Sequence, residues 1–427
     1  MRQRAVCGLL PFMPAERREP LDPDSLTPLD GVYGRRQVRQ LETFLVQLRT
    51  RERVGAHGNR QLFLSDLFVA QLLAFHLPTV RSLRMLDALS VTPVAQQVLQ
   101  SGRLPRSTVS DANKVVDPEL LQPLLADLVQ RVDGRKLPQE LDLLVKRLVA
   151  VDGTFLRVVT ELLWTLRQRT DNHRIVSKPR LDVQLDVAAG VPRFAVLSGH
   201  GRSECQSARL HIEAGKIYVA DKAYFGFDLL RDWLAAGADF VIALNSQIRF
   251  TPEPAINAAA VAPDDRVISD RCGRLTGCNK SKPPTQRLRE IVLRGKDDKP
   301  LRLLTSLVDP GISAFQIGEL YRLRWQIELF FRWLKSCANF RHVISHSPNG
   351  LGAALYVALI ATLLSAVATG RRPSKYTLAT LQFVAAGLTE LEQMLPVLDR
   401  FERERELARA RYARRHAALS AQRYAAK

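Results

Sequence analysis

Residues 148–154, with the sequence LVAVDGT, form a short apolar run that ends in an acid and a glycine. A run of this length, bounded by a turn residue, is typical of a buried β-strand. Further runs of this kind follow, and they alternate with stretches that have helical spacing, so we predict an α/β fold. The strand candidates are LDVQLDV (181–187), RFAVLSG (193–199), KIYVAD (216–221) and FVIALN (240–245), and the helix candidates are SECQSARLHIEAG (203–215) and GFDLLRDWLAAG (226–237).

The sequence on either side of this region has other patterns. Residues 35–132 carry apolar side chains at spacings of three and four, which indicates an all-α region. Within it, Thr108 and Asp111 stand in capping-box register and predict a helix start. Residues 247–310 hold Pro and Gly breaks between strand candidates, which indicates a β-rich insertion. The predicted parts are a helical N-terminal region (1–140), two core parts (141–246 and 311–375) around the insertion, and a basic helical C-terminal region (376–427).

The chain of 427 residues carries a large positive charge. Lys and Arg number 62 against 43 Asp and Glu, which gives a net charge of +19. Such a field attracts phosphates and favours a nucleic-acid partner, although an Arg-rich proteome can raise the charge without one. The five cysteines do not suggest a disulfide framework, and the N-terminus has no convincing signal peptide. We therefore expect a cytoplasmic protein.

One uncharged stretch is nearly long enough to cross a bilayer. It is LGAALYVALIATLLSAVAT, residues 351–369. Its Ala, Gly, Ser and Thr content lowers its hydrophobicity, and the sequence has no second stretch of this kind. We therefore expect a buried core helix and no membrane partner.

Three acids are candidates for chemistry. Asp152 and Asp221 each end an apolar strand candidate, where a sheet presents ligands to a crevice, although either acid could be only a loop cap. Glu328 lies on a long helix predicted over about residues 313–336. Three carboxylates suit a pair of Mg²⁺ ions, for which Mn²⁺ can substitute. Two such ions activate the attacking oxygen and stabilise the leaving oxygen in phosphodiester cleavage.

The helix that carries Glu328 has a polar stripe. At 100° per residue, Tyr321, Arg324 and Lys335 fall within roughly 60° of Glu328 around the helix axis. Arg324 stands four residues before Glu328, so the two could form an ordinary ion pair. Alternatively, Arg324 and Lys335 bind phosphates beside the acids, Arg324 as a bidentate fork and Lys335 as a point charge.

The stripe resembles the YREK signature of one group of bacterial insertion-sequence DDE transposases, the insertion-sequence-four type. Its Tyr, Arg, Glu and Lys are separated by two, three and six residues, as in Tyr321, Arg324, Glu328 and Lys335. This register of four residue types is specific.

Two acidic motifs extend the resemblance to roughly residues 148–369. Asp152-Gly153-Thr154 resembles the first motif of the group. The run Asp221-Lys222-Ala223-Tyr224 resembles the second, usually Asp-Arg-Gly-Tyr, and departs from it at Ala223. The resemblance implies a ribonuclease-H-like core interrupted by a β-rich insertion, with Asp152, Asp221 and Glu328 as catalytic metal ligands.

The resemblance also implies an activity and partners. A cut-and-paste transposase of this group nicks the transposon end, forms a hairpin on that end, reopens it and joins it to target DNA. The N-terminal helices would bind the inverted repeats of double-stranded DNA, and a homodimer would bring two ends together. The expected DNA contacts are Tyr321, Arg324, Lys335, Lys222, Tyr224, Lys178 and Arg180, of which Lys178 and Arg180 could equally be ordinary surface cations. The rival interpretations are a ribonuclease-H-like nuclease without strand transfer and a DNA-binding protein derived from a transposase.

Overall fold

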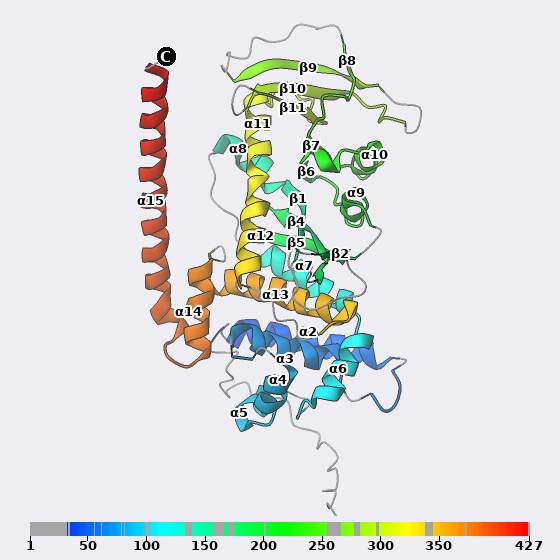
Figure 1. Cartoon of the computed structure of the whole chain (residues 1–427), viewed down its shortest axis with the longest axis vertical. Helices are drawn as coiled ribbons and strands as arrows, with labels where there is room; N and C mark the ends of the chain where they lie inside the picture. The colour runs from blue at the N-terminus through cyan, green and yellow to red at the C-terminus, as the bar shows by residue number, and fades with distance from the viewer. Residues whose placement is uncertain are drawn as a thin grey trace, which may run out of the picture.

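A nine-stranded sheet runs through the middle of the molecule, with helices on both of its faces (Figure 1). Residues 1–30 of the predicted N-terminal region and residues 254–265, 277–281 and 296–298 of the predicted insertion lie outside the described residues. The structure is a computed structural model that describes residues 32, 35–54, 56–60, 62–77, 79–80, 82–98, 102–132, 139–156, 166–169, 175–199, 202–253, 266–276, 282–295, 299–337, 345–371 and 374–425.

The sheet is mixed, with a parallel centre. Its order is β5-β4-β1-β6-β7-β11-β10-β9-β8. Strand β1 pairs parallel with β6, and β6 pairs parallel with β7, whereas the other neighbours are antiparallel. The strands are β1 (Leu148–Phe155), β4 (Arg180–Asp186), β5 (Val191–Ser198), β6 (Ile217–Ala220), β7 (Asp239–Ala243), β8 (Phe250–Pro252), β9 (Val267–Leu275), β10 (Leu288–Arg294) and β11 (Pro300–Thr305), and β2 (Leu166–Arg169) pairs separately with β3 (Ile175–Lys178).

The residues predicted as an insertion extend the central sheet. Strand β11 pairs antiparallel with β7, so that Leu303 lies opposite Ala243. Strands β10, β9 and β8 continue outward from β11. The described residues between 247 and 310 therefore add four strands to the edge next to β7.

Two apolar layers cover the two faces of the sheet, because successive side chains of a strand point to opposite faces. On β1, Leu148 and Ala150 belong to one buried cluster, and Val149 and Val151 belong to the other. The first layer contains α11 (Ala314–Leu323) and α12 (Trp325–Cys337). The second contains α10 (Phe227–Ala235) and borders α9 (Glu204–Ala208) and the 3₁₀ turn η2 (Lys222–Tyr224).

The predicted long helix over residues 313–336 is two helices in line. Arg324 lies between α11 and α12, where its N–H donates to the Tyr321 carbonyl and its own carbonyl accepts from Ile327 N–H. These bonds span three residues and tighten the backbone into a local 3₁₀ turn. Figure 1 shows the two helices as one column beside the sheet.

The described part of the N-terminal region is helical. A helix does begin within residues 105–111, as predicted, but Thr108 is not its N-cap: α6 begins after Pro105, and Thr108 lies within its first turn. Pro105 has an extended backbone and can precede a helix without a side-chain cap. The helices are α2 (Arg35–Arg53), α3 (Leu64–His76), α4 (Leu83–Ser90), α5 (Pro93–Val98), α6 (Arg106–Val115), η1 (Pro118–Leu121), α7 (Gln122–Arg131) and α8 (Gln139–Lys146).

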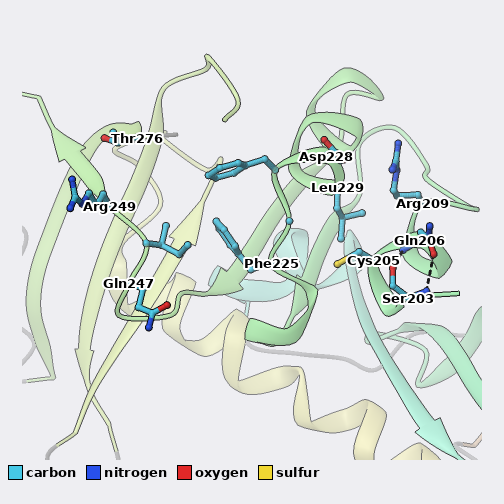
Figure 2. Close-up of a pocket in the computed structure, with 13 residues that line it drawn as sticks. Ser203, Cys205, Gln206, Arg209, Phe225, Asp228, Leu229, Gln247, Arg249 and Thr276 are labelled. Carbon is cyan, nitrogen blue, oxygen red and sulfur yellow. Dashed lines mark hydrogen bonds between the residues drawn. The ribbon is translucent and has the colours of Figure 1, made fainter. Parts of the chain in front are cut away.

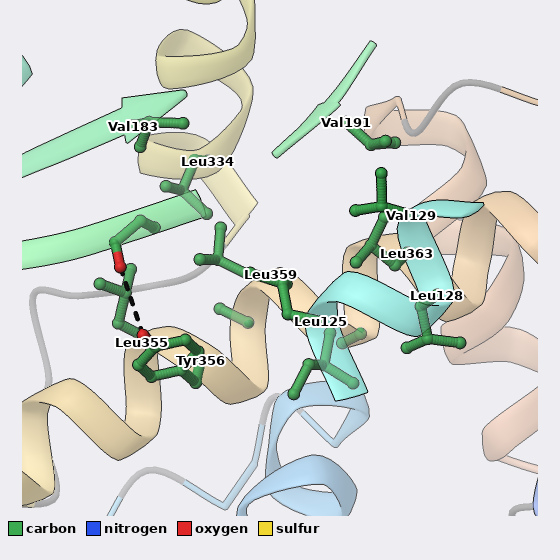
Figure 3. Close-up of a cluster of buried hydrophobic side chains, with 14 of the residues drawn as sticks. Leu125, Leu128, Val129, Val183, Val191, Leu334, Leu355, Tyr356, Leu359 and Leu363 are labelled. Atoms are coloured by element: carbon green, nitrogen blue, oxygen red, sulfur yellow. Dashed lines mark hydrogen bonds between the residues drawn. The ribbon is translucent and has the colours of Figure 1, made fainter. Parts of the chain in front are cut away.

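Helix α13 (Pro348–Thr369) joins the N-terminal helices to the sheet. It contacts α3, α6, α7 and β5, and 83% of its most apolar 18-residue stretch is buried. The prediction of a buried core helix is confirmed. The Tyr356 hydroxyl lies 3.0 Å from Gln122 Oε1 and 3.3 Å from the Ala195 carbonyl oxygen. Figure 3 shows Leu355, Leu359 and Leu363 of this helix among Leu125, Leu128 and Val129 of α7 and Val183 and Val191 of the sheet.

The C-terminal residues form α14 (Lys375–Ala385) and α15 (Leu391–Ala425). Helix α15 packs against α14 and otherwise stands apart from the sheet (Figure 1). Its described side chains from Glu402 onward are exposed. The predicted basic helix is therefore present as a projecting element.

We expect Leu359→Ala to lower the free energy of unfolding by about 2 to 5 kcal/mol, because Leu359 is fully buried and its removal leaves a cavity. Leu388→Ala, at an exposed position, is the control and should change it by less than about 0.5 kcal/mol. Urea titration of the detergent-free protein measures both. Equal midpoints for wild type and Leu359→Ala would contradict the role of α13 as a core helix.

Candidate active site

Two of the predicted acids lie side by side where the parallel strands separate. The parallel pairing of β1 with β6 reaches Ala150 and Val219, and two further residues along each strand lead to Asp152 and Asp221. Adjacent strands lie about 4.8 Å apart, so this register places the two acids abreast at the carboxyl ends. The prediction that Asp152 ends its strand is wrong, because β1 continues along β4 as far as Phe155.

The third acid, Glu328, reaches the same edge of the sheet from α12. Helix α12 contacts β1 and buries Ile327 and Leu334 in the core, which turns Glu328 toward the strand ends. Arg324 links the acids: its Nη2 lies 3.0 Å from Glu328 Oε1, and its Nη1 lies 3.9 Å from Asp152 Oδ2. Arg324 thus lies between two of the predicted acids, and the third, Asp221, follows the strand next to that of Asp152.

The pKa of Asp152 shows that the acids share one electrostatic environment. Burial raises this pKa, the Gly153 N–H and Arg324 lower it, and the charges of Asp221 and Glu328 raise it, with the result at about 6. The Gly153 N–H donates to Asp152 Oδ1 at 2.8 Å. The carboxylates therefore repel one another across a small distance and favour a bound cation.

The donor chemistry of the three acids fits a divalent metal ion. Mg²⁺ prefers carboxylate oxygens and keeps positions for water and phosphate. Within the described ranges, no three His, Cys, Asp or Glu side chains already surround a point that an ion could occupy. Arg324 supplies positive charge among the acids instead, and Asp221 Oδ1 accepts from the Ala223 N–H at 2.7 Å. That bond closes the turn after Asp221, although Ala223 departs from the usual motif.

Of the other residues in the predicted stripe, Lys335 also contacts the first acidic motif, and Tyr321 lies against Arg324. The Lys335 ammonium donates to Thr154 Oγ1 at 2.6 Å and so ties α12 to β1. The Arg324 guanidinium lies over the Tyr321 ring, 5.9 Å from its centroid. Positive side chains therefore border the acids along α12, where a phosphate backbone could approach them.

The remaining predicted DNA contacts have different surroundings. Lys222 is exposed beside Asp221, and Lys178 is half-buried on β3. Tyr224 is 1% exposed in the apolar layer on the other face of the sheet, so it is not on the surface as a DNA contact must be. Arg180 is engaged inside the fold: its Nε and Nη2 donate to the two oxygens of Asp182 at 2.8 and 3.1 Å. The buried Asp182 carboxylate needs this partner.

Sequence reasoning missed two acids next to the site. Asp182 lies opposite Gly153 on β4 and is 5% exposed. Glu204, at the start of α9, packs close to Gly153 as well. The period of two in LDVQLDV places Asp182 on the face opposite its apolar neighbours, which is a signal that the sequence contained. The place of Glu204 depends on how α9 packs, which the sequence does not reveal.

A cavity of about 770 Å³ lies beyond α9 (Figure 2). It separates α9 and the start of α10 from residues 247–249 and 276 at the β8–β9 end of the sheet. Phe225 and Phe227 contribute an apolar side, with their rings in edge-to-face contact. Arg209 and Arg249 add positive charge to the lining. Asp152, Asp221 and Glu328 are not among the residues that line this cavity.

We expect the free energy of unfolding of Asp152→Asn, relative to that of the wild type, to increase as the pH rises from about 4 to 6. Folding raises the pKa of Asp152 to about 6, so the folded protein binds this proton more tightly than the unfolded chain. Between about pH 4 and pH 6 the wild type therefore loses stability that the neutral Asn keeps. The advantage of the variant should grow by about 1 to 3 kcal/mol across that window. Urea unfolding in EDTA measures it, and a constant difference would contradict the shared acid site.

The region that carries the three acids is similar to known transposases. The family model described as Transposase DDE domain matches residues 144–364, which is just over half of the chain. A protein of Sinorhizobium fredii named as a transposase is 30% identical over 207 residues, which are 48% of this chain and 56% of that relative. A transposase of insertion sequence element IS5377 from Geobacillus stearothermophilus is 26% identical over 265 residues, 61% of this chain and 67% of the relative.

A comparison with solved structures gives a weak match. The piggyBac transposase in a synaptic complex with hairpin DNA aligns over 90% of this chain and 85% of its own, with a TM-score of 0.39 and 12% identity. A score of this size does not establish a shared fold. The match over residues 144–364 spans Asp152, Asp221 and Glu328. The chain belongs to the Transposase DDE domain family.

Proposed function

We propose that this protein is a DNA transposase that cuts a mobile element out of DNA and joins it to a new site. The observation that carries the proposal is that Asp221 and Glu328 both lie near enough to Asp152 to raise its pKa, with Arg324 between Asp152 and Glu328, in a chain of this family. The net charge of +19 supports a polyanionic substrate. Double-stranded DNA with inverted repeats at the transposon ends is the substrate that we infer.

The topology supports a ribonuclease-H-like core. In the order β5-β4-β1-β6-β7, the first three strands are antiparallel neighbours and the last three are parallel ones. The acids of β1 and of the turn after β6 then lie at the centre of the sheet edge, and the helix after the added strands brings Glu328. We propose that β8 to β11 are the insertion of this fold and that residues 141–246 and 311–375 form its core.

The site would hold two divalent ions through Asp152, Asp221 and Glu328. When bound, Mg²⁺ or Mn²⁺ would polarise the scissile phosphate and stabilise the leaving oxygen. Arg324 stands between Glu328 and Asp152 and would turn its fork toward a phosphate of the transposon end. Lys335, held by Thr154, and the exposed Lys222 would fix the neighbouring backbone. We infer a hairpin on the transposon end as the intermediate before strand transfer.

The helical N-terminal region and a second copy of this chain would hold the DNA at the active site. Helices α2 to α7 would bind the transposon ends, and a homodimer would hold two ends together. Within α6, Arg106 is exposed, whereas the nearby Arg103 pairs with Asp87 at 3.0 Å. The basic half of α15 and the exposed Lys222 add positive surface. A nuclease without strand transfer is the alternative, and joining of a 3′-hydroxyl end to target DNA separates the two functions.

We expect Asp152→Asn, Asp221→Asn and Glu328→Gln each to reduce end cleavage by about a thousandfold or more, because each removes a charged metal ligand. Binding of the end DNA should stay within about twofold of wild type, since the phosphate contacts remain. Gel assays of cleavage in Mg²⁺ and of binding in EDTA measure the two effects. Glu406→Gln, at an exposed position on α15, is the control. A Glu328→Gln protein that cleaved normally would disprove the assignment.

We expect Arg324→Ala and Lys335→Ala to weaken binding of the cleaved end, with a log–log salt slope shallower by about one for each lost phosphate contact. Arg324→Lys should also be impaired, because an ammonium cannot form a bidentate fork. Arg322→Ala removes a neighbouring arginine that pairs with Glu319, and it is the matched control.

Measuring end binding and hairpin yield at several salt concentrations separates two roles. If Arg324 and Lys335 serve only as partners of Glu328 and Thr154, replacing either changes stability by about 0 to 1 kcal/mol and leaves the slope unchanged. Unchanged slope and yield in both variants would remove the phosphate contacts from the proposal.

A further inference from the structure

A fourth carboxylate approaches the acid site from the opposite face of the sheet. Glu204 is the first residue of α9, which packs on β1 and β4. A Cβ atom placed on Gly153 would lie 3.5 Å from Glu204 Oε1 and 2.7 Å from Asp182 Oδ1. Asp182 Oδ1 therefore occupies the space that a side chain at position 153 would need, and Glu204 Oε1 lies in van der Waals contact with it. Glu204 thus lies directly against the residue that follows Asp152.

The Glu204 carboxylate has no hydrogen-bond or ion-pair partner among the described residues. Burial raises the pKa of Glu204, Arg180 lowers it, and the charges of Asp182 and Asp221 raise it further. Glu204 is therefore near enough to Asp221 for the two charges to repel. Holding these acids together has an electrostatic cost that a bound cation would offset.

A buried hydroxyl lies near enough to the same acids to feel their charges. Tyr224 is 1% exposed, and its hydroxyl has no hydrogen-bond partner among the described residues. Burial raises the pKa of this phenol, and the charges of Asp182, Asp152 and Glu204, in that order, raise it further. An unpaired buried hydroxyl is destabilising, so its presence here calls for an acceptor.

Asp182 is not a free acceptor for the Tyr224 hydroxyl. Its carboxylate already accepts four hydrogen bonds, two from Arg180 and one each from Ser198 and Ser207. Three of these bonds go to Oδ2 and one goes to Oδ1, and a carboxylate has about four lone-pair positions in all, so Asp182 has little capacity for a further donor. The acceptors that remain among the three acids near the hydroxyl are Asp152 and Glu204. Because Asp152 Oδ1 is already bonded to the Gly153 N–H, Glu204 is the acceptor with two open oxygens.

We propose that Glu204 is a fourth carboxylate ligand of the divalent-metal site and that Tyr224 is a positioning residue whose hydroxyl holds it. A small rotation of the Glu204 side chain past Gly153 would carry its carboxylate toward Asp152 and Asp221. The buried hydroxyl of Tyr224 would then donate a hydrogen bond to this carboxylate. Gly153 leaves the passage open because it has no side chain. This inference rests on the proposed metal-dependent function of the three acids.

The first test is Mn²⁺ binding by the full-length protein without DNA, followed by electron paramagnetic resonance. We expect Glu204→Gln to weaken binding about tenfold, because it keeps the size of the side chain but removes a ligand charge. Asp228→Asn changes an acid of α10 that pairs with Arg231, and it should bind Mn²⁺ as the wild type does.

Asp152→Asn separates the two levels of the proposal. If Asp152→Asn loses Mn²⁺ while Glu204→Gln binds normally, the fourth ligand is wrong and the proposed function stands. If neither variant loses Mn²⁺, the metal site itself is wrong, and both proposals are overturned.

The second test is Tyr224→Phe, which removes only the unpaired hydroxyl. We expect its melting temperature in EDTA to equal or exceed that of the wild type, because no hydrogen bond is lost, while its Mn²⁺ affinity falls several-fold. Tyr218→Phe is the matched control: Tyr218 Oη accepts from the Glu213 N–H at 2.8 Å, so its loss should lower the melting temperature and spare Mn²⁺ binding. Unchanged Mn²⁺ affinity in Tyr224→Phe would overturn the positioning role.

Discussion

Repulsion between carboxylates at one edge of the sheet is the constraint on which the rest of the site depends. The parallel pairing of β1 and β6 ends just before Asp152 and Asp221, so the backbone itself forces these two acids together. Burial is the main reason that the pKa of Asp152 is raised, and the charges of Asp221 and Glu328 raise it further. The surrounding fold supplies counter-charge and rigid backbone to hold the acids in place.

Counter-charge comes from two arginines on opposite faces of the sheet. Arg324 on α12 balances Glu328 and Asp152, whereas Arg180 on β4 is committed to Asp182 by a two-pronged ion pair. These roles differ because Asp182 is 5% exposed and cannot lose its partner, whereas the acids beside Arg324 face the solvent edge. Arg324 is therefore the arginine that a metal ion could displace at low cost, and a displaced guanidinium becomes available to a phosphate.

Sequence reasoning found the parts of this arrangement that have a local pattern. The apolar runs predicted β1, β4, β5, β6 and β7, and the register of Tyr321, Arg324, Glu328 and Lys335 predicted a single polar stripe. It erred where packing decides the outcome. Tyr224 reads as a polar motif residue, yet its ring fills an apolar layer beside Trp233 and Phe240. The stretch SECQSARLHIEAG has helical spacing, but only Glu204–Ala208 forms a helix.

The sequence could not predict how α9 meets β1, because that contact joins residues about fifty positions apart. Gly153 illustrates what the contact between α9 and β1 explains. In the sequence it reads as a turn residue after an acid, which predicted the end of the strand at Asp152. In the structure β1 continues to Phe155, and a side chain at this position would meet the Asp182 carboxylate of β4, with the Glu204 carboxylate of α9 in contact beside it. The absence of a Cβ atom therefore lets Asp182 of β4 and Glu204 of α9 approach β1 closely at the residue that follows Asp152.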